Sequence, residues 1–465
     1  MRYIMKKIFF VLFTLVLLVN CAAVDGLNIV DIAETPENTD VSGYPRFAVL
    51  SDGTLLMTTD SNAVSFSTDK GNSWKKVGRA PVAAAATEKT TESGTTHKLT
   101  RANLQPFTLA DGRVLLAYRS HTSNYSGSGE FYTSIRVMVS ESSGKFYKGE
   151  KILVENVSYG SNRGFWEPFF IQLDSDTVAM YYADDLSTFL KSQQRIAYFT
   201  YKISTDEWAG PFDAVHRKIG VLSRDGMPTV TALRSGGFAM VVEVQDYASW
   251  NSNKNSVFAV GLSLSKDGKS WSDPVPVIGP EDLNAGIRTS APSIATLPDG
   301  RVIITYQTDK GYYGANGSGD YKRVFGAAIS KGALTLDSNL VPTIGGVSEG
   351  FEFLPDLFEY SENQYQIWNT VSCFGNDVYF AGTSGINTAD GNRTSHRINI
   401  RRAEVTTLMG DVDGDKKITE ADAKAALKLV GESACNESAY IADMNASGRI
   451  ELKDVFEIVK TQKRG

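Results

Sequence analysis

Residues 44–59 read YPRFAVLSDGTLLMTT, and this stretch sets the pattern for most of the chain. A proline precedes an apolar run, a Ser-Asp-Gly turn follows, and a second apolar run completes the unit. Two apolar runs around an Asp-Gly turn are typical of a β-hairpin, and a leading proline fits the first residue of a strand. The stretch therefore predicts a hairpin.

The same design recurs five more times, at starts about 62 residues apart. A fixed period indicates a repeat architecture, and this period leaves room for two further strands in each unit. Six four-stranded units predict an all-β fold, a closed six-bladed β-propeller over residues 24–405. The predicted hairpins are residues 44–59, 105–119, 167–183, 227–243, 291–307 and 354–369.

Two short segments resemble the Asp-box, or bacterial neuraminidase repeat. They are residues 67–74, STDKGNSW, and residues 265–271, SKDGKSW. The aspartate is expected to accept backbone N–H bonds in a tight turn, while the tryptophan packs between strands. We therefore assign these segments a structural role and no chemistry.

The composition and the N-terminus narrow the class of protein. A net charge of -6 over 465 residues offers no basic stripe for nucleic acid and no polybasic cluster for a membrane surface. Residues 1–23 combine early basic residues, an apolar run too short to span a bilayer, and small residues at the end, which predicts a signal peptide and a secreted protein. Lipidation at Cys21 is the alternative. Cys373 and Cys435 fall in different predicted domains, so no structural disulfide is expected.

In a propeller, equivalent positions of every blade lie on one face, so the repeats predict which side chains ring the mouth of the central channel. One set is the residue before each proline, and the other is the residue about seven after each turn glycine. The first set is Tyr44, Gln105, Glu167, Met227, Ala291 and Leu354. The second set is Asp60, Arg119, Ala183, Glu243 and Gln307.

Two carboxylates stand out at these positions, Glu167 and Glu243, on neighbouring blades. Glycoside hydrolysis needs such a pair, because one carboxylic acid protonates the leaving oxygen while a carboxylate attacks the anomeric carbon or activates water. The alternative is that each glutamate pairs with an arginine at a blade junction. Two glutamates at matching positions favour the catalytic interpretation.

Residues 164–168, GFWEP, and residues 224–230, RDGMPTV, resemble segments of the glycoside hydrolase family 93 exo-arabinanases. The likeness covers most of residues 24–405. It implies a six-bladed sialidase-like propeller that releases arabinobiose from linear α-1,5-arabinan with retention of configuration. It also implies that Glu167 is the nucleophile and Glu243 the acid/base. Asp225 departs from the family, which is expected to have proline there.

Three further residues are predicted to contact sugar hydroxyls: Tyr182, Asp184 and Arg224. A role in packing between blades is the alternative for each. A sialidase is the rival enzyme, because Asp-boxes and six blades suit it equally, and Arg46, Arg119 and Arg288 offer an arginine triad. The characteristic Arg-Ile-Pro opening of sialidases is absent. A non-catalytic carbohydrate-binding propeller is the third possibility. In an enzyme the two glutamates should face each other across the channel, and in a binding propeller they need not.

After residue 405 the pattern changes to short helices and acidic loops. Oxygen donors recur at positions 1, 3, 5, 7, 9 and 12 of two loops, which is the EF-hand pattern for Ca²⁺. The first loop offers Asp411, Asp413, Asp415, Lys417 (by its carbonyl), Thr419 and Asp422. The second offers Asp443, Asn445, Ser447, Arg449 (by its carbonyl), Glu451 and Asp454.

This pair of loops resembles a type I-like dockerin, and Lys416 replaces the usual glycine at position 6 of its first loop. The resemblance implies a small α-helical dockerin domain over residues 406–465 that holds two Ca²⁺ ions. It also implies docking to a cohesin module of a scaffold protein. Together the two domains predict a cellulosome-associated enzyme on plant cell-wall arabinan.

Overall fold

The computed structural model describes most of the chain, with gaps. The predicted signal peptide and Cys21 lie outside the described residues, as do Asp415, Asn445, Ser447 and Arg449. The described residues are 26–30, 43–60, 64–76, 86–140, 144, 147–186, 194–215, 224–245, 258–279, 288–308, 324–343, 345–358, 364–387, 393–413, 417–432, 439–444 and 450–463.

The described strands form six antiparallel sheets, numbered here by their order along the chain. Sheet 1 holds β2 (Arg46–Val49), β3 (Leu55–Thr58), β4 (Val64–Ser67) and β5 (Lys75–Lys76). Sheet 2 holds β6 (Glu88–Thr90), β7 (Thr96–Thr108), β8 (Val114–Thr122), β9 (Glu130–Ser140) and β10 (Tyr147–Tyr159). Sheet 3 holds β11 (Phe165–Gln172), β12 (Thr177–Asp184), β13 (Arg195–Lys202) and β14 (Glu207–Val215).

The remaining strands form the other three sheets. Sheet 4 holds β15 (Arg224–Ala232), β16 (Phe238–Gln245), β17 (Phe258–Ser265), β18 (Val275–Gly279) and β22 (Gly346–Val347). Sheet 5 holds β19 (Thr289–Thr296), β20 (Val302–Thr308), β21 (Val324–Ser330) and β23 (Phe351–Phe353). Sheet 6 holds β24 (Gln364–Phe374), β25 (Asp377–Asn387), β26 (Arg393–Val405) and β1 (Leu27–Val30).

The six sheets close into a ring. The strands β2, β7, β11, β15, β19 and β24 contact one another in that order, and β24 contacts β2 again. Each pair of neighbouring sheets also buries its own apolar cluster between the two faces. The second strands β8, β12, β16 and β20 contain long apolar runs because both faces of each sheet are covered in this way. The ring places the ends of all six inner strands around one axis.

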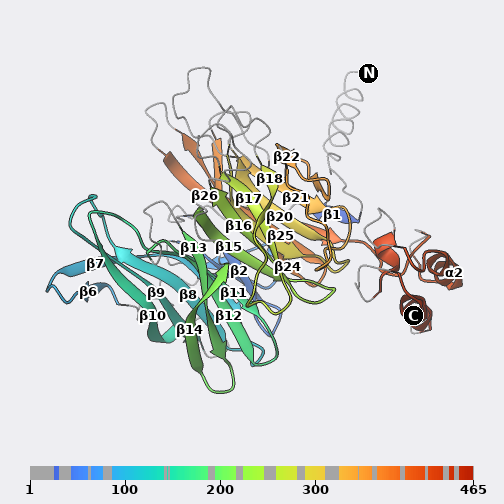
Figure 1. The fold of residues 1–465 in the computed structure, drawn as a ribbon, viewed down its shortest axis with the longest axis horizontal. Helices are drawn as coiled ribbons and strands as arrows, with labels where there is room; N and C mark the ends of the chain where they lie inside the picture. The colour runs from blue at the N-terminus through green and yellow to red at the C-terminus, as the bar shows by residue number, and fades with distance from the viewer. Residues whose placement is uncertain are drawn as a thin grey trace, which may run out of the picture.

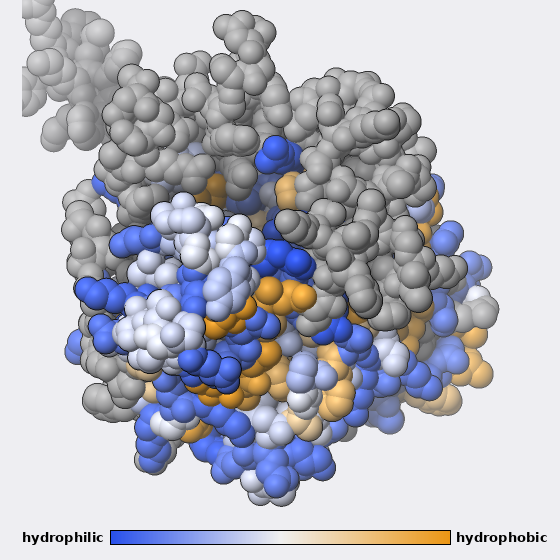
Figure 2. All heavy atoms as spheres, turned by 60° about the vertical axis from the view of Figure 1, so that its left-hand side comes forward, coloured by the Kyte–Doolittle hydropathy of each residue, from blue (hydrophilic) through white to orange (hydrophobic). Residues whose placement is uncertain are grey.

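Sheet 2 extends beyond the others at the left of Figure 1, where β6 and β7 lie. Figure 2 brings this side of the molecule forward. It shows mostly hydrophilic side chains, with a band of hydrophobic side chains across the middle of the face.

The sixth predicted hairpin, residues 354–369, is wrong. The hairpin of sheet 6 is β24 and β25, which pair around a turn at Gly375. Pro355 instead follows β23, the outer strand of sheet 5. Pro355 and the apolar residues next to it have the same pattern as the start of a repeat, but they lie at the edge of sheet 5. The pairing of β1 with β26, which completes sheet 6 from the other end of the chain, was not predicted.

Both Asp-box segments have the predicted structural role. Asp69 accepts the backbone N–H of Ser73 at 2.9 Å, and the Trp74 ring lies 5.9 Å from that of Phe47. Asp267 accepts the backbone N–H of Ser270 at 2.9 Å. The Trp271 ring meets Tyr181 edge-on at 5.8 Å.

The C-terminal residues form a small helical unit, at the right of Figure 1. Its elements are α2 (Glu420–Lys428), η2 (Ala439–Ala442) and α3 (Leu452–Gln462), around a core of Ala423, Ala426, Ala442, Ile450 and Ile458. Each α-helix has a capping box that uses an aspartate at its third position, Asp422 or Asp454. Among the described helices, none is long and apolar enough to cross a bilayer.

Candidate active site

The inner strands share one backbone irregularity at the mouth of the ring. In five of them the strand pairing shifts register at this point, and a residue other than glycine has positive φ there; in sheet 1 such a residue comes just before β2. A left-handed conformation costs such a residue about 1–2 kcal/mol, so the surrounding ring must hold it in place. The six residues are Tyr44, Asn103, Glu167, Met227, Ala291 and Trp368.

These residues confirm four members of the first predicted set and correct two. Asn103, and not Gln105, occupies the position in sheet 2, because the irregularity comes before the proline and Gln105 already pairs with Ala117. Trp368, and not Leu354, occupies it in sheet 6. Glu167 has a φ of 43° and stands directly before Pro168.

The second predicted set is confirmed as a ring of equivalent positions at the end of the second strand of each hairpin. Arg119, Ala183, Glu243 and Gln307 pair with the residue just before the positive-φ residue of their own sheet. Asp60 lies at the matching place, where its N–H donates to the Gly43 carbonyl. Thr383 is the sixth member, which sequence reasoning missed with the hairpin of sheet 6.

Four members of this second set link one sheet to the next. In each case an oxygen of the side chain accepts the backbone N–H of the positive-φ residue in the following sheet. The bonds run from Asn103 to Asp60 at 2.6 Å, from Ala291 to Glu243 at 2.9 Å, from Trp368 to Gln307 at 3.2 Å and from Tyr44 to Thr383 at 3.2 Å. The last bond closes the ring.

Glu243 is fixed by two contacts. Its Oε2 accepts the N–H of Ala291, and its Oε1 lies 3.3 Å from Nη1 of Arg224. The residue is 8% exposed. The predicted sugar-binding residue Arg224 therefore lies beside this carboxylate, from β15 of the same sheet.

Glu167 is half-buried and lies in a charge cluster that includes Glu243. Burial raises the pKa of Glu167 from 4.5 to about 7, against the lowering effect of the Arg119 guanidinium. The charge of Glu243 raises this pKa as well, while Arg224 and Arg46 lower it. The two predicted carboxylates are therefore close enough for their charges to interact across the sheet junction.

Aromatic rings and a third carboxyl group complete this cluster. The Arg46 guanidinium lies 3.8 Å from the Tyr44 ring centre, and the Arg119 guanidinium lies 4.3 Å from that of Trp166. Burial raises the pKa of Asp60 to about 7, although its bond from Asn103 opposes this. Sequence reasoning placed Asp60 and Arg119 at the mouth, but it gave no role to Trp166, whose only signal was its place next to Glu167.

Tyr182 and Asp184 contact other residues of the sheets and are buried. Each is 1% exposed. The Tyr182 ring lies between Phe165 and Phe199 in the apolar cluster of sheets 2 and 3. Asp184 accepts a hydrogen bond from Nη2 of Arg195 at 3.0 Å. The structure therefore favours the packing alternative for both residues.

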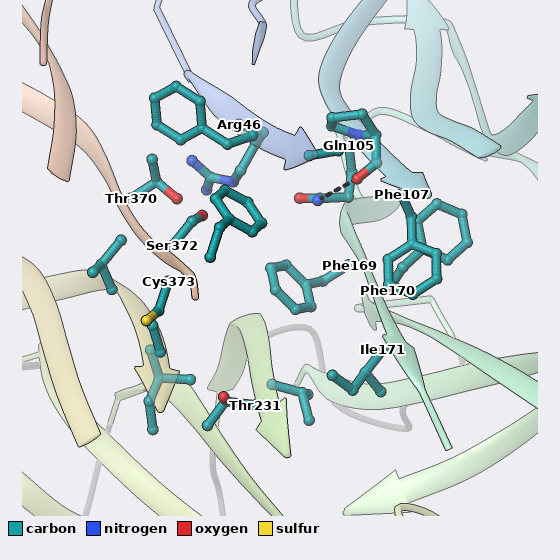
Figure 3. A pocket seen from close by; sticks show the side chains of 18 of the residues that line it. Arg46, Gln105, Phe107, Phe169, Phe170, Ile171, Thr231, Thr370, Ser372 and Cys373 are labelled. Carbon is teal, nitrogen blue, oxygen red and sulfur yellow. Dashed lines mark hydrogen bonds between the residues drawn. The ribbon is translucent and has the colours of Figure 1, made fainter. Parts of the chain in front are cut away.

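A cavity of about 300 Å³ lies on the ring axis, beyond the positive-φ residues and toward the hairpin turns. All six inner strands contribute to its lining, and Figure 3 shows the labelled side chains around it, with Arg46 and Gln105 close to each other and Thr231 across from them. Neither Glu167 nor Glu243 lines it. Arg46 belongs both to this cavity and to the charge cluster around Glu167.

Three of the predicted metal ligands come together in the C-terminal unit. Carboxylate oxygens of Asp411, Asp413 and Asp422 lie within 4.8 Å of one another. Three carboxylates are a donor set that suits a hard cation such as Ca²⁺. In the second loop, Asp443 and Asp454 are buried, and the charges of Glu451, Asp454 and Asp443 all act on Lys453.

Known proteins resemble this chain in fold. A structure of the family 93 α-L-arabinofuranosidase of Fusarium graminearum with arabinobiose matches at a TM-score of 0.50 and 17% identity, over 81% of this chain and 98% of that one. The Penicillium chrysogenum α-L-arabinanase complexed with arabinobiose gives 0.48 at 17% identity, over 81% and 98%. A leech intramolecular trans-sialidase gives 0.47 at 10% identity, over 80% and 70%. No protein-family model and no curated protein sequence matches.

The Fusarium structure shows the fold of this chain. Its match extends over nearly the whole of that enzyme, so the ring of sheets described above is the fold that the two proteins share. The match leaves about a fifth of this chain uncovered.

Proposed function

We propose that this protein is a secreted retaining glycosidase, an exo-1,5-α-L-arabinanase that releases arabinobiose from linear arabinan. The observation that carries the proposal is the placement of Glu167 and Glu243, two acidic side chains from neighbouring sheets whose charges interact at the mouth of the ring. The proposal takes the six sheets as the blades of a six-bladed propeller over residues 24–405. The arabinobiose bound to two structures of similar fold supports the choice of substrate.

In the proposed first step, the Glu167 carboxylate attacks the anomeric carbon of the second arabinose unit from the non-reducing end. The glycosidic C–O bond breaks, its electron pair stays on the leaving oxygen, and Glu243 donates a proton to that oxygen. Water then hydrolyses the glycosyl–enzyme ester, with Glu243 taking a proton back from it. Oε2 of Glu243 accepts the Ala291 N–H and Oε1 accepts a hydrogen bond from Nη1 of Arg224, so both oxygens are held in place at the mouth.

Arg224 contributes to this chemistry through its position. Its Nη1 donates to Oε1 of Glu243, and its side chain is 37% exposed toward solvent. A guanidinium in this place has donors left over for sugar hydroxyl groups. We therefore keep Arg224 as a sugar-binding residue.

Product analysis tests the proposal. The mature protein is incubated with linear α-1,5-arabinan beside Glu167→Gln and Glu243→Gln variants, and products are separated by anion-exchange chromatography. We expect arabinobiose from the native protein and a loss of at least about 10³-fold in each variant. Binding of arabinan without any product would show the non-catalytic carbohydrate-binding alternative instead.

A sialidase remains the second candidate, because one observation favours it. The guanidinium groups of Arg46, Arg119 and Arg224 all act on Glu167, with Arg224 in place of the predicted Arg288, and the Tyr44 hydroxyl interacts with the same carboxylate. Three arginines suit the carboxylate of a sialic acid. Release of sialic acid from sialyllactose, with no product from arabinan, would establish this candidate.

For residues 406–465 we propose a dockerin that folds around two Ca²⁺ ions and docks to a cohesin module. The carboxylate group of Asp411, Asp413 and Asp422 and the two matching capping boxes support this proposal. Isothermal calorimetry with CaCl₂ on the full chain tests it, and we expect two ions per chain. Asp422→Ala and Asp454→Ala should each remove one of them.

A further inference from the structure

We propose that the cavity on the ring axis is a second binding site, which takes a small hydroxy carboxylate from the face opposite the mouth. Arg46 binds the carboxylate group of this ligand, and Gln105 binds a hydroxyl group. The site is separate from the mouth, where the proposed function places arabinan.

The cavity has one buried end and one open end. At the end nearer the mouth, Arg46, Gln105 and Thr370 are 2%, 5% and 2% exposed. At the end nearer the hairpin turns, the lining side chains are only half-buried. These are Thr108, Thr231, Thr296 and Ser372. The cavity therefore opens to solvent on the face that carries the turns and ends at Arg46 and Gln105.

Apolar side chains separate this cavity from the mouth. Four of the six positive-φ residues pack together in one apolar cluster, from sheets 1, 4, 5 and 6. They are Tyr44, Met227, Ala291 and Trp368. Each comes earlier on its strand, or just before it, than the residues of that sheet that line the cavity. A polar ligand bound in the cavity is therefore kept apart from the carboxyl groups at the mouth.

Arg46 gives the buried end a positive charge that has no ion-pair partner among the described residues. Its Nη1 donates to the carbonyls of Pro45 at 2.8 Å and Asn369 at 3.3 Å. Its charge acts on Asp60 and Glu167, but no hydrogen bond joins it to either of them in the described part of the chain. A buried charge is costly without a partner, and a guanidinium has five N–H donors. A carboxylate is the anion whose geometry fits it best.

Gln105 adds a hydrogen-bond acceptor close to this charge (Figure 3). Its Nε2 donates to the carbonyl of Pro106 at 3.0 Å, which fixes the amide. Its Oε1 is buried and has no donor among the described residues, and the same holds for Oγ1 of Thr108. A carboxylate cannot supply the missing hydrogen, whereas a hydroxyl group can. The ligand that satisfies both Arg46 and Gln105 therefore carries a hydroxyl group as well as a carboxylate.

The rest of the lining suits a short carbon chain. Phe47, Phe107, Phe169 and Phe170 give it apolar walls. Thr370 and further hydroxyl side chains lie between them. A volume of about 300 Å³ is at the lower end of the range for ligand pockets, about 300–1,000 Å³. The cavity is therefore large enough for a small organic acid and not only for a single ion.

The acidic groups near the open end are neutralised by partners. Burial, and then the charges of Asp299 and Asp377, raise the pKa of Cys373, which lines the cavity. Asp299 pairs with Arg301 at 2.8 Å, and Asp377 pairs with Arg402 at 3.1 Å. Entry of an anion therefore meets little repulsion at this end.

A series of three six-carbon compounds tests the chemistry of the site. Binding of gluconate, sorbitol and hexanoate to the full chain is measured by saturation-transfer difference NMR. We expect gluconate to bind, and sorbitol and hexanoate to bind at least about tenfold more weakly, because sorbitol lacks the carboxylate and hexanoate lacks the hydroxyl groups. No binding of gluconate, or equal binding of all three, would overturn the proposal.

Variants test where gluconate binds. Gln105→Leu and Arg46→Gln should each weaken its binding at least about tenfold, while Arg224→Gln, which removes a charge at the mouth, should leave it unchanged. Thermal midpoints show which variants are folded. Gln105→Leu is the safer of the two, because the only described hydrogen bond of its side chain is to the next residue.

The pattern of loss decides between the two places. Binding that is lost in Arg224→Gln and kept in a folded Gln105→Leu variant would place gluconate at the mouth and refute the second site. Binding that depends on Gln105, in a protein that releases nothing from arabinan, would refute the proposed substrate and leave the second site standing.

Discussion

Replacing Glu243 by alanine should destabilise the ring as well as abolish activity, because this side chain has two tasks. Its Oε2 accepts the N–H of Ala291, which is 1% exposed. Glu243→Ala leaves that buried donor without a partner, at a cost of about 1–3 kcal/mol. Glu243→Gln keeps an amide oxygen for the same bond, so it should cost little while removing the acid. The difference in unfolding free energy between the two variants is therefore predicted to be about 1–3 kcal/mol.

Urea unfolding followed by tryptophan fluorescence measures this difference. All six tryptophans lie between residues 74 and 368, so the signal reports on the ring and not on the C-terminal unit. The measurement is made at pH 6, where Glu167 is mostly protonated and the repulsion that Glu243 exerts on it is small. Gln307→Ala, which frees the N–H of Trp368, should show a similar loss. If Glu243→Ala and Glu243→Gln agree within about 0.5 kcal/mol, the linking role of the bond is refuted.

Three further predictions follow from the site, the packing and the C-terminal unit. Because burial raises the pKa of Glu167 to about 7, the carboxylate that attacks the sugar forms only as pH rises through that value, and kcat/KM on arabinan should rise between about pH 5 and pH 7; a flat profile over this range would contradict this. Tyr182→Phe should leave KM for arabinan unchanged, whereas Tyr182→Ala should lower the unfolding free energy by about 3–5 kcal/mol, and a raised KM in Tyr182→Phe would restore the sugar-binding role. EDTA should remove the helical circular dichroism of residues 406–465 and leave arabinan hydrolysis intact, and helices that persist in EDTA would count against folding by calcium.

Much of the ring could be predicted from local pattern. A hairpin such as residues 44–59 is specified by its own turn and apolar runs, so five of the six inner hairpins and the mouth positions of Glu167 and Glu243 follow from sequence periodicity. The sixth could not be found by the same rule, because β24 has no leading proline and the proline at 355 belongs to the edge of sheet 5. The repeat was recognised from the order of residues along the chain alone. A segment with the same order of proline and apolar residues, one strand before the true hairpin, therefore looks like a repeat.

The side-chain environment of the site was less predictable. Arg119 stacks on Trp166 because two sheets pack face to face, and no spacing in the sequence encodes that contact. Tyr182 and Asp184 are near the mouth in sequence, which is why they are predicted to bind sugar. Side chains alternate between the two faces of a strand, however, and that of Tyr182 points into an apolar interface between sheets. The sequence specifies which strand a residue is on, while the packing between sheets decides what its side chain meets.

The seam of sheet 6 has a mechanical consequence. Leu27 pairs with Val405, and the N–H of Thr406 donates to the carbonyl of Gly26. The first and last strands of the ring are therefore hydrogen-bonded to each other just before the C-terminal unit begins. The last strand therefore cannot be locked until nearly four hundred residues have emerged, which makes this pairing a late event in folding. A force applied to the C-terminal unit also acts first on the short pairing of β1 with β26. If the protein is tethered through its C-terminal unit, the pairing of β1 with β26, which forms late in folding, bears the tethering force.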